Sequence, residues 1–124
     1  MKVLQIIDTL NVGGAERIFV TISNLLEKNK IFINSLFLLN EGVLKIQLNE
    51  NIKTVELKRD NKWSLLKMYE CSKVLKSYDL IHCHFKHVYV YIRLVSFIFN
   101  IKTPILFHSH SSKKLNATSL FILK

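Results

Sequence analysis

Short apolar runs that alternate with amphipathic segments most restrict what this chain can fold into. Residues 3–7 and 31–39 are dense in aliphatic side chains, as in strands that are buried on both faces. Between these runs, apolar residues recur at helical spacing over residues 15–26. Alternation of this kind predicts a parallel sheet with helices on both faces, joined by right-handed crossovers.

The same alternation continues to residue 108. Strands are expected at residues 52–57, 79–84 and 104–108, and helical segments at 43–48, 63–77 and 88–99. We therefore predict an α/β fold over residues 1–112, a Rossmann-like parallel sheet of about five strands with helices on both faces. Residues 113–124 are expected to be a tail, either poorly ordered or the start of a missing element.

Periodicity also predicts which side chains the helices bury. In the first two long helices, the expected core stripes are Ala15, Ile18, Phe19, Ile22, Leu25 and Leu26, then Leu65, Leu66, Tyr69, Val74 and Leu75. Trp63, Cys71 and Cys83 are also expected in the core. Two cysteines are too few for a disulfide-stapled secreted scaffold, so we expect a cytoplasmic protein with free thiols.

Charge restricts the choice of partners. Eighteen Lys and Arg residues against nine Asp and Glu give a formal net charge of +9, which favours anionic partners. The basic residues are scattered, and no helix-turn-helix, zinc-finger or RNP-like pattern accompanies them, so nucleic acid is not expected. The longest apolar stretch, residues 88–101, is interrupted and is too short to cross a bilayer.

In open α/β sheets, ligands bind beyond the carboxyl ends of the strands, and a glycine pair lies at that edge after the first strand. Gly13 and Gly14 allow close approach of a ligand to the backbone, and the helix behind them presents unpaired N–H groups to a phosphate or carboxylate. The alternative is an ordinary tight turn, with Glu16 complementing the helix dipole.

All five histidines lie at the end of the fourth or the fifth expected strand. His82, His84 and His87 form one group, and His108 and His110 form the other. His82 and His84 are expected to share one side of their strand, with Cys83 on the other. Imidazoles suit zinc or copper, but no histidine pair on a helix, carboxylate cluster or cysteine pair completes a closed ligand set. We therefore expect no metal, and hydrogen bonds from these rings to sugar hydroxyls and phosphates instead.

Taken together, these motifs resemble the N-terminal domain of family 4 glycosyltransferases, which have the two-domain GT-B architecture. The first strand with Gly13-Gly14-Ala15-Glu16-Arg17 is similar to that family's opening strand, glycine loop and first helix. The segment from Asp79 to His87 and the strand that ends in His108-Ser109-His110 are similar to its histidine motifs. The resemblance covers residues 1 to about 112.

The resemblance implies transfer of a sugar, with retention at the anomeric carbon, from a nucleotide-sugar to a saccharide or lipid-linked acceptor in polysaccharide or glycoconjugate biosynthesis. The resemblance also implies that Gly13 and Gly14 lie against the donor diphosphate or sugar. It implies that His110 hydrogen-bonds the sugar near the reaction centre. Glu16, His84 and His87 are expected to line the acceptor pocket. No cofactor is implied beyond the nucleotide-sugar, which is a co-substrate.

The sequence departs from the family pattern in one major respect. The C-terminal domain and its pair of donor-binding glutamates are missing, so we expect no transferase activity from this polypeptide alone. The basic charge and the apolar segment 88–99 fit peripheral contact with the inner face of a membrane; the alternative, which is favoured, is that this helix covers the sheet. Two other readings stay open: a nicotinamide-dinucleotide-binding domain, with Glu41 as the ribose ligand, and a truncated, non-enzymatic interaction module.

Overall fold

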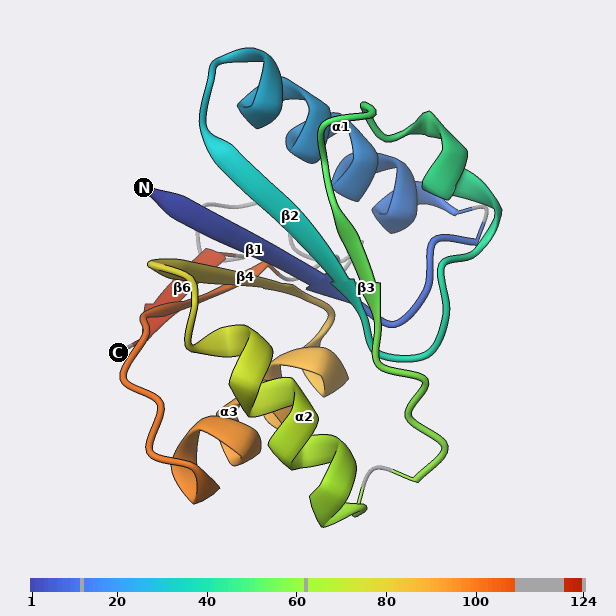
Figure 1. The fold of residues 1–124 in the computed structure, drawn as a ribbon. Coiled ribbons are helices and arrows are strands. Elements are labelled where there is room, and N and C mark those ends of the chain that lie inside the picture. Colours follow the sequence, from blue (N-terminus) through green and yellow to red (C-terminus); the bar gives the residue numbers. More distant parts are fainter. Residues whose placement is uncertain (12, 62, 109–119, 124) are drawn as a thin grey trace.

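Six strands form a single sheet in a computed structural model that describes residues 1–11, 13–61, 63–108 and 120–123 (Figure 1). The strands are β1 (Lys2–Ile7), β2 (Phe32–Phe37), β3 (Thr54–Glu56), β4 (Leu80–His84), β5 (Ile105–His108) and β6 (Leu120–Leu123). They lie in the order β3-β2-β1-β4-β5-β6. The first five pair in parallel, which confirms the predicted Rossmann-like sheet.

Helices cover both faces of this sheet (Figure 1). The helical elements are α1 (Gly14–Lys28), the 3-10 helix η1 (Val43–Gln47), α2 (Leu65–Leu75) and α3 (Lys86–Ile98). α1 and η1 lie on one face, and α2 and α3 lie on the other. Apolar runs without alternation are typical of strands in this position, because side chains on both sides of each strand are buried.

The central strand β1 contributes to two separate apolar cores. Leu4 and Ile6 belong to the core under α2 and α3, which also contains Cys71 and Cys83. Side chains on the opposite side of β1 belong to the core under α1 and η1. Both cysteines are fully buried, as expected from the sequence.

The buried face of α1 differs from the predicted stripe. Phe19 is buried as predicted, but Ile18 and Leu25 are exposed, and Val20 and Ser23 are buried outside the predicted stripe. The helix is therefore rotated about its axis relative to the prediction, and a polar side chain on β1 accounts for this. Gln5 is fully buried, and its amide Nε2 donates to Ser23 Oγ at 3.0 Å. A buried amide needs such a partner, so the helix turns Ser23 toward the sheet.

The stripe predicted for α2 is also largely wrong. Leu65, Leu66 and Tyr69 are exposed, and so is Trp63, which precedes the helix. The buried residues of α2 are Met68, Cys71, Ser72 and Leu75. Ser64 caps the helix by accepting from Lys67 N, so the helix begins after Trp63 rather than at it. With apolar residues on more than one side, periodicity alone did not identify the inward face.

The last described residues extend the sheet. β6 pairs antiparallel with β5, with Leu123 opposite Ile105 and Leu120 opposite His108. These residues belong to the segment 113–124, which was expected to be a tail. Across the part of the chain that the structure describes, no helix is long and apolar enough to cross a membrane.

Candidate functional site

An acid–imidazole pair lies where β1 and β4 end. Asp8 follows β1, and His87 lies in the first turn of α3, directly after β4. Because β1 and β4 are neighbours in the sheet, the pair is brought together and His87 Nε2 hydrogen-bonds Asp8 Oδ2. The other carboxylate oxygen, Oδ1, lies 3.9 Å from an Arg59 guanidinium nitrogen. Asp8 therefore links the ends of two strands to the segment that follows β3.

A pocket of about 540 Å³ opens beside this pair. Its lining combines three basic or imidazole side chains with aromatic and aliphatic ones: Arg59, Trp63, Lys86, His87, Val90, Tyr91 and Leu94. The Arg59 guanidinium lies 4.5 Å from the centre of the Tyr91 ring, a cation–π contact that orients the guanidinium. Burial raises the pKa of Tyr91 to about 12, so its hydroxyl stays protonated at neutral pH. The pocket thus offers cations and flat apolar walls together.

The turn between β4 and α3 is strained. Phe85 has a φ of 75°, a conformation that costs a non-glycine residue on the order of 1–3 kcal/mol. This turn separates two histidines that occupy different environments. His84 is fully buried, whereas the His87 side chain is 61% exposed. Of these two residues, only His87 is among those that line this pocket.

The glycine pair before α1 is not explained by backbone conformation. Gly13 is extended, with φ 174° and ψ 166°, and Gly14 begins the helix. A Cβ on Gly14 would meet no atom within 4 Å, and one on Gly13 would meet the Glu16 carboxylate at 2.4 Å. By contrast, Gly42 has a φ of +74°, and a Cβ there would lie 2.5 Å from the Leu10 carbonyl carbon. Gly42 is thus structurally required, while open space lies over Gly14.

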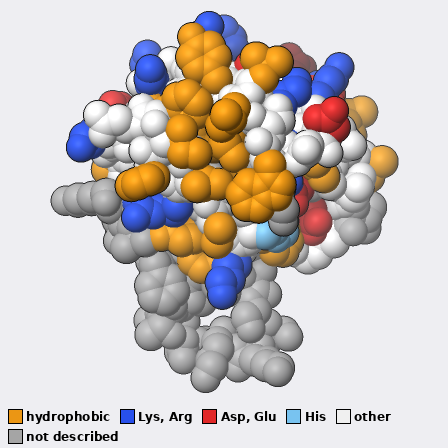
Figure 2. Space-filling model, turned by 90° about the horizontal axis from the view of Figure 1, so that it is seen from below, with side chains coloured by type: hydrophobic (Ala, Val, Ile, Leu, Met, Phe, Trp, Pro, Cys, Tyr) orange, Lys and Arg blue, Asp and Glu red, His pale blue; other side chains and the backbone are white. Residues whose placement is uncertain are grey.

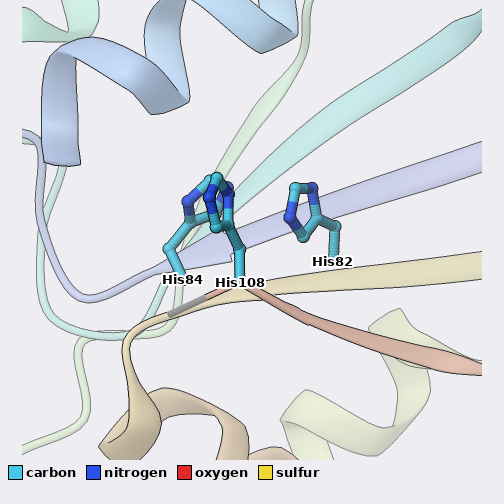
Figure 3. A group of neighbouring side chains, drawn as sticks. All are labelled: His82, His84 and His108. Carbon is cyan, nitrogen blue, oxygen red and sulfur yellow. The ribbon is translucent and has the colours of Figure 1, made fainter. Parts of the chain in front are cut away.

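Three histidines gather on the α1 side of the sheet (Figure 3). His82 and His84 come from β4, and His108 pairs with His84 across the β4–β5 ladder. Ring centres are 4.4 Å apart for His82 and His84, and each lies 5.7 Å from His108. His82 and His84 are buried and His108 is partly exposed. Burial lowers the pKa of His108, which favours the neutral imidazole.

A hydrogen-bonded chain supports this cluster from beneath α1. His84 Nε2 lies 2.5 Å from Gln5 Oε1, and Gln5 Nε2 donates to Ser23 Oγ. Phe19 packs edge-on against His84, with 5.0 Å between ring centres. The predicted orientation of the strand is confirmed, because Cys83 lies in the core on the opposite side of the sheet. Burial raises the pKa of the Cys83 thiol well above its usual range, so it is not a nucleophile.

The structure brings together only part of the predicted site. Glu16 lies beside Gly13, and His87 lines the pocket, but the proposed catalytic residue His110 falls outside the described residues. Sequence reasoning missed Asp8 and Arg59. Asp8 had a usable signal, since it is an acid directly after a fully apolar strand at the ligand-binding edge. Arg59 follows the end of β3, and no local pattern brings its side chain to a pocket beside α3.

The chain matches no protein-family model, and a search of curated proteins finds no match. The fold class is shown by the structure itself. A doubly wound α/β sheet hosts many unrelated activities, so a function has to be argued from the chemistry of the site.

Proposed function

We propose that this chain is the acceptor-side domain of a glycosyltransferase that moves a sugar from a nucleotide-sugar to a saccharide or lipid-linked acceptor. The main support for this proposal is that two features lie at the same edge of the sheet, where the parallel strands have their carboxyl ends. One is the glycine pair at the start of α1. The other is the Arg59–His87 pocket at the start of α3.

The glycine pair fits a diphosphate. The long helix α1 presents unpaired backbone N–H groups at its first turn, and its dipole favours negative charge there. The space over Gly14 lets phosphate oxygens approach these groups, whereas a side chain would obstruct them. Backbone donors fixed in this way stabilise a leaving diphosphate as its negative charge develops.

The pocket beside α3 fits the acceptor. Asp8 accepts from His87 Nε2–H, which leaves Nδ1 of His87 to accept a hydrogen bond from a sugar hydroxyl. Arg59 and Lys86 match a phosphate or carboxylate on the acceptor. Trp63 and Tyr91 supply aromatic faces against which the apolar face of a sugar ring or a lipid chain can pack.

The surface around this pocket suits a lipid-linked acceptor at the inner face of a membrane. Figure 2 shows apolar side chains gathered on the side of the molecule that carries α2 and α3. Exposed apolar residues of these helices are Leu65, Leu66, Tyr69, Val90, Phe97 and Ile98. Together with a net charge of +9, they favour peripheral contact with an anionic bilayer.

Backbone amide NMR on the isotope-labelled chain tests the proposal. Nucleoside diphosphates and their sugar conjugates are expected to shift the resonances of Gly13, Gly14 and the first turn of α1 at millimolar concentration. A weak affinity is expected because a second domain holds most of the donor in such enzymes. NAD at the same concentration is the comparison ligand.

Gly14→Ala supplies the matched variant. Its methyl group meets no protein atom, so the fold is retained while the approach of a phosphate is obstructed. We expect the nucleotide-induced shifts to disappear in this variant. Shifts that persist in Gly14→Ala, or stronger shifts with NAD than with the nucleoside diphosphates, contradict the proposal and favour a dinucleotide-binding domain.

A further inference from the structure

Strand pairing fixes three imidazoles around one point. His82 and His84 are two residues apart on β4 and point to the same side, and His108 lies opposite His84 on β5. One ring nitrogen from each lies within 4.8 Å of the other two. A tetrahedral zinc with bonds of about 2.0–2.1 Å holds its nitrogen ligands about 3.4 Å apart. Closing the widest separation by roughly 1.5 Å requires only small side-chain rotations on a rigid strand pair.

We propose that His82, His84 and His108 bind a divalent transition-metal ion, with zinc as the occupant. Three imidazoles without a carboxylate favour zinc, copper or nickel over magnesium and calcium, which prefer oxygen ligands. Three protein ligands leave the fourth tetrahedral position for water or another oxygen donor. The ion is shielded because His82 and His84 are buried, and it has a route to solvent on the partly exposed side of His108.

The hydrogen bonds behind His84 match the needs of a metal ligand. Gln5 Nε2 donates to Ser23 Oγ, which turns Gln5 Oε1 toward His84 Nε2; in the tautomer that donates from Nε2, Nδ1 of His84 carries the lone pair that a metal needs. Metal-bound histidines typically donate their second ring N–H to a fixed acceptor in this manner, which orients the ring and raises its basicity. Gln5 and Ser23 are both fully buried, so this support does not exchange with water.

The metal site is separate from the proposed acceptor pocket. The histidine cluster lies on the α1 side of the sheet, whereas Arg59, His87 and Tyr91 line a pocket beside α3 on the other side. The metal proposal does not depend on the sugar-transfer proposal. Either can fail alone, because one is measured by metal binding and the other by nucleotide-induced shifts at Gly14.

Cobalt and zinc titrations of the full chain test the site. The protein is prepared without a histidine tag, stripped with a chelator and titrated with Co²⁺, followed by displacement with Zn²⁺. We expect one equivalent of Co²⁺ to give the visible absorption of a four-coordinate site, and Zn²⁺ to abolish it. X-ray absorption spectroscopy of the zinc-loaded native chain is expected to count three imidazole ligands, a readout that requires no variant to fold.

Two histidine variants assign the ligands. His108→Gln removes a ligand from the less buried position and is expected to weaken Zn²⁺ binding more than roughly 100-fold. His87→Gln removes an imidazole outside the cluster and is expected to change the affinity less than about twofold. Equal affinity in native protein and His108→Gln overturns the assignment. The assignment is also overturned if His87→Gln loses Zn²⁺ binding, if the bound zinc has fewer than three imidazole ligands, or if the native chain binds no stoichiometric metal.

Discussion

At the scale of single residues, Asp8 connects three segments of the chain. Its carboxylate bonds His87 at the start of α3 and lies 3.9 Å from Arg59 after β3. Asp8→Asn preserves the shape but removes the charge that both partners face. We expect a loss of about 1 kcal/mol in the free energy of unfolding, measured by urea denaturation.

Asp60→Asn is the matched control for this variant. Asp60 is exposed and lies next to Arg59 in sequence, so it loses the same charge close to the same cation. A change within about 0.5 kcal/mol is expected there. If the two variants lose the same free energy, the Asp8 effect arises from overall charge and not from the contacts at the strand ends.

The two buried thiols set a pH dependence for stability. Burial raises the pKa of Cys71 to about 12 and that of Cys83 well above 9, whereas an unfolded thiol titrates near 8.5. The folded state therefore keeps both protons above pH 8.5 while the unfolded state loses them. The free energy of unfolding should be independent of these thiols below that pH and fall by about 1.4 kcal/mol per thiol per pH unit above it.

Denaturation between pH 7 and 10.5 checks this slope. Cys71→Ala with Cys83→Ala is the comparison, and this double variant is expected to be less stable at pH 7 but to lose less stability with rising pH. In the native chain, neither thiol should react with a water-soluble disulfide reagent at pH 8 until denaturant is added. Rapid labelling without denaturant would show that the cores open more readily than their packing implies.

At the scale of elements, two glycines have opposite roles. Gly42 precedes η1 with a positive φ, and a Cβ there would collide with the Leu10 backbone, which cannot move as a side chain can. Gly42→Ala is expected to cost about 2 kcal/mol or more. Gly14→Ala is expected to be neutral or to stabilise the chain by up to about 1 kcal/mol, since alanine favours the helix and meets no obstacle.

Thermal unfolding of the two glycine variants measures this contrast. The expected order of midpoints is Gly42→Ala below the native chain, and Gly14→Ala equal to it or above. A strongly destabilised Gly14→Ala would mean that the glycine pair is needed for folding. The open space over Gly14 would then be no sign of a ligand site.

Strands were predicted from the sequence more accurately than the faces of helices. The apolar runs of β1 and β2 have one interpretation, because a strand covered on both sides needs no inward face to be chosen. α1 and α2 have apolar residues on several sides, and polar contacts decided their rotation. Ser23 faces inward because Gln5 needs a partner, and Ser64 sets where α2 begins. Such contacts join residues distant in sequence, so periodicity does not contain them.

The histidine cluster was only partly predictable, because it too depends on contacts between residues that are distant in sequence. Alternation on β4 places His82 and His84 on one side, and the usual strand order places β5 beside them. The register that sets His108 opposite His84 depends on the length of the α3–β5 connection, which no local pattern determines. Metal motifs on helices and in cysteine pairs have a fixed spacing in sequence, whereas a ligand set made by two neighbouring strands depends on the register between them.

At the scale of the whole molecule, charge and exposed apolar surface predict how the chain meets a membrane. We expect it to sediment with vesicles that contain anionic lipid, and to bind less as salt rises, because basic residues near the headgroups contribute about 1 kcal/mol each at most. Phe97 on α3 is 85% exposed. Phe97→Ser is expected to lower binding about tenfold, since inserting an aromatic ring contributes roughly 1.5–3 kcal/mol.

Ile46 offers a control of equal exposure. It is also 85% exposed, but it lies on η1, on the opposite face of the sheet from α3. If the α2–α3 face contacts the lipid, Ile46→Ser leaves vesicle binding unchanged while Phe97→Ser reduces it. Equal losses in both variants would indicate non-specific adsorption. Equal binding to neutral and anionic vesicles would remove the role of the positive charge, and membrane contact would then rest on the apolar face alone.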